Sequence, residues 1–187
     1  PVHRTHIPQT CGDCHVRPAE EYVTSIHGQR LAEGDPEAPV CSDCHTAHAI
    51  SRTDVQPFML DIVSECGECH NQDNGGAPLY ETYRRSYHGQ VTQLGYERAA
   101  RCNDCHGYHD VLPTEDPASS LHPGANRIAT CAASADGQSN CHPTANANFA
   151  EFQPHADYRD VHNYPVLYGV WMYFVIVMSA TFGFFGL

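Results

Sequence analysis

The sequence contains no lysine, and its ten basic residues, all arginines, are outnumbered by 22 acidic residues. The formal net charge of −12 argues against a nucleic-acid-binding protein, because such proteins present a basic surface to the phosphate backbone. Strand-like alternation of apolar and polar residues is also scarce. No signal peptide is visible in the sequence, which begins at Pro1, and we expect that an export signal was removed or is not recorded.

Cysteine and histidine, by contrast, are abundant, with ten and fourteen copies. Four segments have the pattern Cys-x-x-Cys-His: Cys11/Cys14/His15, Cys41/Cys44/His45, Cys66/Cys69/His70 and Cys102/Cys105/His106. This pattern is typical of c-type haem attachment, in which two thiols bond the porphyrin edge and the histidine ligates the iron. Zinc bound by paired Cys-x-x-Cys units is the rival interpretation, but it gives no reason for a histidine after every pair.

A fifth, stretched motif consists of Cys131, Cys141 and His142, with nine residues between the cysteines. The intervening segment is small and polar, as an outward bulge requires. We expect it to bind a fifth haem c, with a disulfide between the two cysteines as the alternative that an oxidising compartment permits.

The first four motifs form two tandem di-haem repeats, 11–50 and 66–111, within residues 1–111. Both repeats contain Tyr-x-x-Ser-x-His-Gly-Gln, with its histidine 14 residues before the next motif, and both end in Cys-His-x-x-His. The second repeat has a loop-like insertion at 71–78. The repeats thus supply four candidate second ligands: His27, His48, His88 and His109.

Spacing limits which haem each histidine can serve. His48 follows His45 by three residues, a reach of only about 10 Å, so we expect it, and likewise His109, to ligate a neighbouring haem. For the fifth haem the candidate second ligands are His122, His155 and His162, with His3 and His6 as less favoured choices. Met59 is the only methionine outside the C-terminal segment, so we expect bis-histidine haems of mostly low potential.

The C-terminal segment 163–187 has no charged residue. Its last 23 residues are long enough to span a bilayer as a helix, and Tyr164, Tyr168 and Trp171 crowd its first turns as an interfacial belt would. A buried core helix is the alternative. We expect a transmembrane helix that continues beyond the recorded chain, with the haem-bearing part on the periplasmic side of the cytoplasmic membrane.

The expected fold is mainly α with much coil: short helices wrapped around a stacked multihaem array, plus one C-terminal transmembrane helix. Helices should end at the haem motifs and at the Tyr-x-x-Ser-x-His turns. Residues 112–162 form a connection that carries the fifth-haem segment, and 112–140 is expected to be extended.

The four motifs and the two Ser-x-His-Gly strings resemble those of multihaem c-type cytochromes. With the stretched fifth motif, the chain would be a pentahaem member. The membrane segment makes the chain similar to the membrane-anchored, quinol-linked respiratory and photosynthetic members of that class. These include pentahaem subunits of respiratory complexes and haem-c domains fused ahead of a membrane cytochrome b. The resemblance implies electron transfer between a quinol-linked membrane subunit and a soluble redox protein. The lipid bilayer is a further expected partner, and nucleic acid is not. A catalytic multihaem oxidoreductase and a haem-filament subunit are the alternatives.

Overall fold

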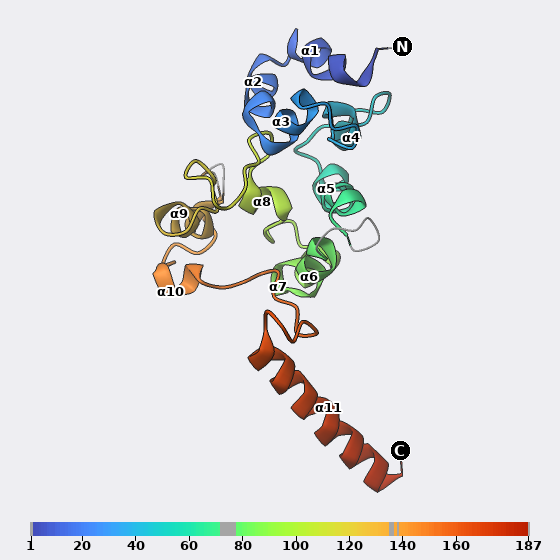
Figure 1. Ribbon diagram of the computed structural model, residues 1–187, viewed down its shortest axis with the longest axis vertical. Helices are drawn as coiled ribbons and strands as arrows, with labels where there is room; N and C mark the ends of the chain where they lie inside the picture. Colours follow the sequence, from blue (N-terminus) through green and yellow to red (C-terminus); the bar gives the residue numbers. More distant parts are fainter. Residues whose placement is uncertain (1, 72–77, 135–136, 138, 187) are drawn as a thin grey trace. The chain divides into compact units, whose positions relative to one another are not determined.

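The computed structural model describes residues 2–71, 78–134, 137 and 139–186. These residues form short helices joined by long irregular segments, and no strand occurs among them (Figure 1). The helices are η1 (Arg4–His6), α1 (Ile7–Gly12), α2 (Val16–Thr24), α3 (Ile26–Ala32), α4 (Cys41–His45), α5 (Gln56–Cys69), α6 (Leu79–Arg85), α7 (Tyr87–Gln93), α8 (Cys102–His106), α9 (Ala125–Ala133), α10 (Ala147–Ala150) and α11 (Pro165–Phe185). The expected mainly helical fold with much coil is therefore confirmed.

The chain divides into two compact units, Pro1–Phe152 and Gln153–Leu187. The first unit contains both repeats and the stretched fifth motif. Its apolar core is small: among the described residues, the buried apolar side chains are Ala38, Val40, Val63, Tyr83, Ala99 and Ala150. So few aliphatic side chains cannot by themselves offset the conformational entropy of a domain this size.

Helix boundaries in the first unit follow the sequence signals. Helix α2 ends at Ser25 and α6 ends at Ser86, and both serines have the same extended backbone, with φ/ψ of −70°/163° and −67°/163°. The next helix of each repeat then begins at the following residue. The prediction that helices end at the Tyr-x-x-Ser-x-His turns is confirmed.

The segment 112–140 differs from its predicted extended form, because helix α9 occupies Ala125–Ala133. Four alanines favour this helix, and Gly124, with φ of 96°, precedes it. The buried Thr130 hydroxyl donates to the Ser120 carbonyl at 2.8 Å and packs the helix against the preceding turn. The insertion at 71–78 lies mostly outside the described residues.

The second unit is dominated by α11, a 21-residue helix without charged side chains. At 1.5 Å per residue its length is about 30 Å, the thickness of the hydrocarbon core of a bilayer. It is the one helix among the described residues that is long and apolar enough to cross a membrane. Near its start Trp171 contacts Tyr158 and Tyr168, with ring centroids 5.3 and 5.7 Å apart.

Candidate haem-binding sites

Each ordinary motif lies in or at the end of a helical turn. Helices α4 and α8 consist of the motif itself, while α5 ends at Cys69. The backbone N–H of His15 donates to the Cys11 carbonyl at 2.8 Å, and that of His70 donates to the Cys66 carbonyl at 3.0 Å. Positions i, i+3 and i+4 of a helical turn share one face. The two thiols and the imidazole are therefore arranged along one side of the chain.

The predicted attachment thiols differ in exposure. Cys14 and Cys69, each the second cysteine of the first motif of its repeat, are exposed, whereas the other eight are partly buried. Cys14 is therefore less buried than most of the predicted attachment cysteines. It stands just after α1, beside the exposed His15, where little of the chain covers it. Attachment of a haem at Cys14 stays a prediction from the motif.

The stretched fifth motif closes in the same way as the ordinary ones. The backbone N–H of His142 donates to the Cys131 carbonyl at 3.2 Å, the contact that the ordinary motifs make between their histidine and first cysteine. The N–H of Cys141 donates to the Ala132 carbonyl at 2.9 Å, which holds the two ends of the inserted segment together. Cys131 is a free thiol, so no disulfide closes the fifth motif in this structure. The fifth motif thus keeps the local backbone contact of a haem attachment site.

Thiol contacts join the motifs in sequence. The Cys11 thiol lies close to that of Cys41, and burial together with this neighbour raises the pKa of Cys41 to about 11. Cys66 and Cys102 form the same contact in the second repeat. In each repeat, therefore, the first cysteines of the two motifs meet, which would place the attached edges of two porphyrins side by side.

The fourth and fifth motifs are also neighbours. Burial raises the pKa of Cys105 to about 12, and Asp104 and the nearby Cys131 and Cys141 thiols add to the rise. Burial and the nearby Cys66 thiol likewise raise the pKa of Cys44 to about 12, so the five motifs form a continuous series through the first unit.

Three histidines of the motifs face a histidine from another part of the chain. The ring centroids of His45 and His109 are 6.0 Å apart, with 34° between the ring planes. The centroids of His27 and His70 are 6.3 Å apart, at 39°. Those of His88 and His142 are 6.1 Å apart, at 47°. Each pair joins one motif histidine to one histidine outside the Cys-x-x-Cys-His strings.

These separations fit two imidazoles on opposite sides of one iron. An imidazole nitrogen binds a first-row metal at about 2.0 Å, and the ring centroid lies roughly 1.2 Å behind it, so trans rings have centroids about 6.4 Å apart. The described residues gather no group of three or more His, Cys, Asp and Glu side chains suited to a metal ion. Each pair could supply two imidazoles, which is the number of axial protein ligands in a bis-histidine haem.

The electrostatics of the pairs favour neutral imidazoles. Burial lowers the pKa of His27, His45 and His88, and the facing histidine lowers it further in each case. A neutral imidazole is the form that ligates a metal. Burial therefore favours the neutral, ligating form of His27, His45 and His88.

The shared spacing of the two Tyr-x-x-Ser-x-His-Gly-Gln strings has a structural reason. The Tyr22 hydroxyl donates to the Pro39 carbonyl at 2.8 Å, and the Tyr83 hydroxyl donates to the Ala100 carbonyl at 2.9 Å. Each acceptor stands two residues before the first cysteine of the next motif. Burial raises the pKa of both phenols to about 12, so they stay protonated donors. The tyrosine thus ties the segment that carries the histidine of the string to the following motif.

The serine of the string caps the histidine-bearing helix. The backbone N–H of Gly28 donates to the Ser25 hydroxyl at 3.1 Å, and that of Gly89 donates to the Ser86 hydroxyl at 3.2 Å. These are N-cap hydrogen bonds. A Cβ added at Gly28 would lie 2.1 Å from the carbonyl oxygen of the string's tyrosine, and one at Gly89 would lie 2.0 Å from its counterpart. Only glycine permits this close approach of two helices.

An aspartate inside the second motif of each repeat caps the motif helix. Asp43 accepts a hydrogen bond from the Val40 N–H at 2.7 Å, and Asp104 accepts one from the Arg101 N–H at 2.8 Å. Each aspartate also pairs with an arginine, Arg4 at 2.6 Å and Arg101 at 3.0 Å. The sequence repeat had not singled out these aspartates, although Cys-x-Asp-Cys-His occurs in both copies.

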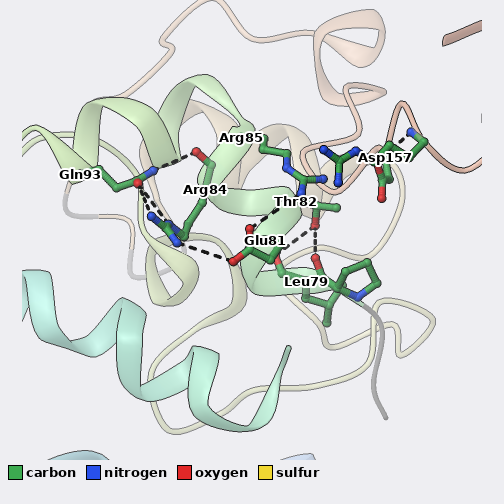
Figure 2. Close-up of polar contacts among 9 residues, drawn as sticks. Leu79, Glu81, Thr82, Arg84, Arg85, Gln93 and Asp157 are labelled. Carbon is green, nitrogen blue, oxygen red and sulfur yellow. Dashed lines mark hydrogen bonds and ion pairs between the residues drawn. The ribbon is translucent and has the colours of Figure 1, made fainter. Parts of the chain in front are cut away.

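In the second repeat a further set of contacts fixes the corner between α6 and α7 (Figure 2). The Arg84 guanidinium donates to Gln93 Oε1 at 2.9 and 3.1 Å, and Gln93 Nε2 donates back to the Arg84 carbonyl at 2.9 Å. Arg84 also lies 3.6 Å from Glu81. Since His88 is the second residue of α7, this corner sets the direction in which its helix leaves α6.

A pocket adjoins the second motif. Its lining includes Cys44, His45 and Phe58, and the Phe58 ring lies parallel to that of His45, with a 5.3 Å centroid separation and 5° between the planes. Stacking on Phe58 restricts rotation of the imidazole. Helix α5 therefore helps to orient the motif histidine that faces His109.

The remaining predicted ligands are placed as follows. The sequence suggested His122, His155 and His162 as partners of His142, whereas the ring that faces His142 in the structure is that of His88. The reason is that the histidine of each Ser-x-His-Gly string faces the motif after its own repeat. His122 is half-buried, and its Nδ1 has no hydrogen-bond partner within the described part of the chain. His155 and His162 belong to the second unit.

The other five histidines lie at the surface, at the end of α8 or in the N-terminal turn. His15 and His48 are exposed, and His106 closes α8. His3 and His6 lie 6.1 Å apart, a separation that follows from their spacing of three residues in one helical turn. Comparison with known proteins finds no family model, curated protein or solved structure that matches this chain.

Proposed function

We propose that the chain is a membrane-anchored multihaem c-type cytochrome that relays electrons between a quinol-linked membrane partner and a periplasmic redox protein. The observation that carries the proposal is the set of three long-range imidazole pairs, with centroids 6.0–6.3 Å apart. Each pair contains the histidine of a different motif, so the pairing supports haem c at three of the five motifs independently of the sequence pattern.

Haem c supplies reversible one-electron redox chemistry, and the chain's own residues set its conditions. Ten cysteines would attach the haems, and His15, His45, His70, His106 and His142 would be the first axial ligands. Two imidazoles at three of the motifs would occupy both free coordination positions of a bound haem, which would favour electron transfer over catalysis at an open iron. The thiol contacts between Cys11 and Cys41 and between Cys66 and Cys102 support closely spaced haems within each repeat.

Helix α11 supports attachment to a bilayer, since it is long, apolar and largely exposed within the second unit. Haem c is attached on the exported side of the cytoplasmic membrane, so we place residues before α11 in the periplasm. Trp171 and its two tyrosine neighbours suit the interface between headgroups and acyl chains. Electrons would pass between the membrane partner and the haems at the periplasmic surface of the membrane.

The test is reduction of the detergent-purified native assembly by a menaquinol analogue, followed through the haem absorbance. Intact mass of the same preparation counts the attached haems, and we expect five. Rapid reduction that is lost when the assembly is stripped to this chain would place the quinol site in the membrane partner. A chain that carries five haems but is reduced in neither form would contradict the quinol-linked relay. A mass without haem would contradict the cytochrome itself.

A further inference from the structure

The imidazole pairs follow the register of the repeats. His27, in the first repeat, faces His70, in the first motif of the second repeat. His88, in the second repeat, faces His142, in the motif that follows that repeat. The histidine of each Ser-x-His-Gly string thus faces the next repeat along the chain, and the fifth motif takes the position of the first motif of a third repeat.

The Cys-His-x-x-His histidine faces in the opposite direction. His109, near the end of the second repeat, faces His45, in the second motif of the preceding repeat. His48 is its counterpart in the first repeat, three residues after the motif histidine. By the same register, His48 would face a haem that precedes the first repeat.

The local backbone supports the equivalence of these two histidines. The chain leaves α4 through Thr46, at φ/ψ of 59°/169°, and leaves α8 through Gly107, at 87°/171°. A positive φ at a threonine is uncommon, so the same turn is imposed in both repeats despite the different residue. The segments that carry His48 and His109 therefore leave their motif helices in the same direction.

The surroundings of the two histidines differ. The His109 side chain is 34% exposed and lies against the His45 ring, with its Nδ1 3.6 Å from Glu21 Oε2. The His48 residue is exposed at the surface of the first unit. We propose, on the basis of the function proposed above, that His48 is an axial ligand for a c-type haem carried by another protein, which extends the electron path across the interface.

Charge indicates the kind of partner. Residues 4–70 contain eleven acidic residues and four arginines, whereas residues 79–111 contain four of each. All four arginines within residues 4–70 are already paired with carboxylates. A second copy would bring two acidic surfaces together, which like-charge repulsion opposes. The partner is therefore a different haem protein with a basic surface, whose haem has one open axial position.

The test uses the full haem-loaded chain and a probe: a short basic peptide carrying one Cys-x-x-Cys-His haem with an open second axial position. Titration is followed by the change of the probe haem from high spin to low spin. We expect saturable binding at a ratio of one to one, weakened at least tenfold in His48→Ala. The matched control is Thr53→Ala, which changes another exposed residue of the same segment and leaves probe binding unchanged.

Three results would overturn the proposal. Equal probe binding by wild type and His48→Ala would show that His48 is not the acceptor. An additional high-spin haem in His48→Ala without probe would show that it ligates one of the chain's own haems. A dimer of the chain alone that is lost in His48→Ala would make a second copy the partner. Loss of all covalent haem would instead contradict the proposed function, and intact mass separates the two failures.

Discussion

The imidazole of His109, in the second repeat, faces that of His45, in the first, with ring centroids 6.0 Å apart. The contact joins two motifs that are distant in sequence. It also agrees with the spacing argument that a histidine three residues after a motif serves another haem. Ligation of iron by the pair stays a prediction, and it can be tested one histidine at a time.

Removal of His109 should open one haem. In His109→Ala we expect one more high-spin haem than in wild type, about one fifth of the total, because the iron at the second motif loses its second imidazole. Electron paramagnetic resonance and carbon monoxide binding by the reduced protein measure this number. Thr53→Ala, a change at an exposed residue, is the control and should match wild type. An unchanged spin state in His109→Ala would mean that the pair does not bind iron.

Removal of the stretched motif should remove one haem. Replacement of Cys131 and Cys141 by alanine is expected to lower the intact mass by one haem and leave the other four attached. In that background His88→Ala should produce no additional high-spin haem, whereas in the wild-type background it should produce one. If His88→Ala opens a haem in both backgrounds, His88 serves a motif other than the fifth.

Gly28→Ala should destabilise the first repeat. The added Cβ would lie 2.1 Å from a backbone carbonyl oxygen, and a clash with backbone cannot be relieved by a rotamer change. We expect a loss of about 3 kcal/mol in the free energy of unfolding, the upper end of overpacking costs. Thermal unfolding of the haem-loaded protein measures it. Gly169→Ala is the matched control, since a Cβ there has no neighbour within 4 Å.

Truncation after Tyr164 should release the protein from the membrane. Without α11 the chain loses its one described helix able to span a bilayer, so we expect at least tenfold more of it in the aqueous phase after detergent phase separation. The haem count should not change, because every motif lies before residue 143. A truncated chain that stays in the detergent phase would show that another surface provides the attachment.

Local features were predictable from the sequence, and long-range ones were not. The ends of α2 and α6 at Ser25 and Ser86 followed from capping chemistry, which depends on neighbouring residues alone. Helix α9 was missed because Pro, Gly and Ser residues before it suggested an extended segment, while its alanines and the buried Thr130 favour a helix. The apolar segment after residue 164 indicated α11 within two residues at either end.

The histidine that faces His142 was not among the candidate ligands named from the sequence. Those candidates were chosen by elimination, on the assumption that His27, His48, His88 and His109 serve the haems of the four ordinary motifs. His88 instead faces the motif beyond its repeat, and that choice depends on how the repeats pack together. The exposure of Cys14 has the same origin, since a motif pattern does not say which parts of the chain will cover it. Spacing limits how far a side chain can reach, but it does not determine which loops meet in space.

The opposite directions of the pairs have a consequence for biogenesis. His27 precedes its partner motif in the chain, whereas His109 follows its partner by an entire repeat. During N-terminus-first export, the third haem would find its second ligand already across the membrane, while the second haem would wait for a segment not yet delivered. A chain stalled between these points would expose a five-coordinate iron to oxygen. Rapid completion of export would therefore protect the unfinished protein from oxidative damage.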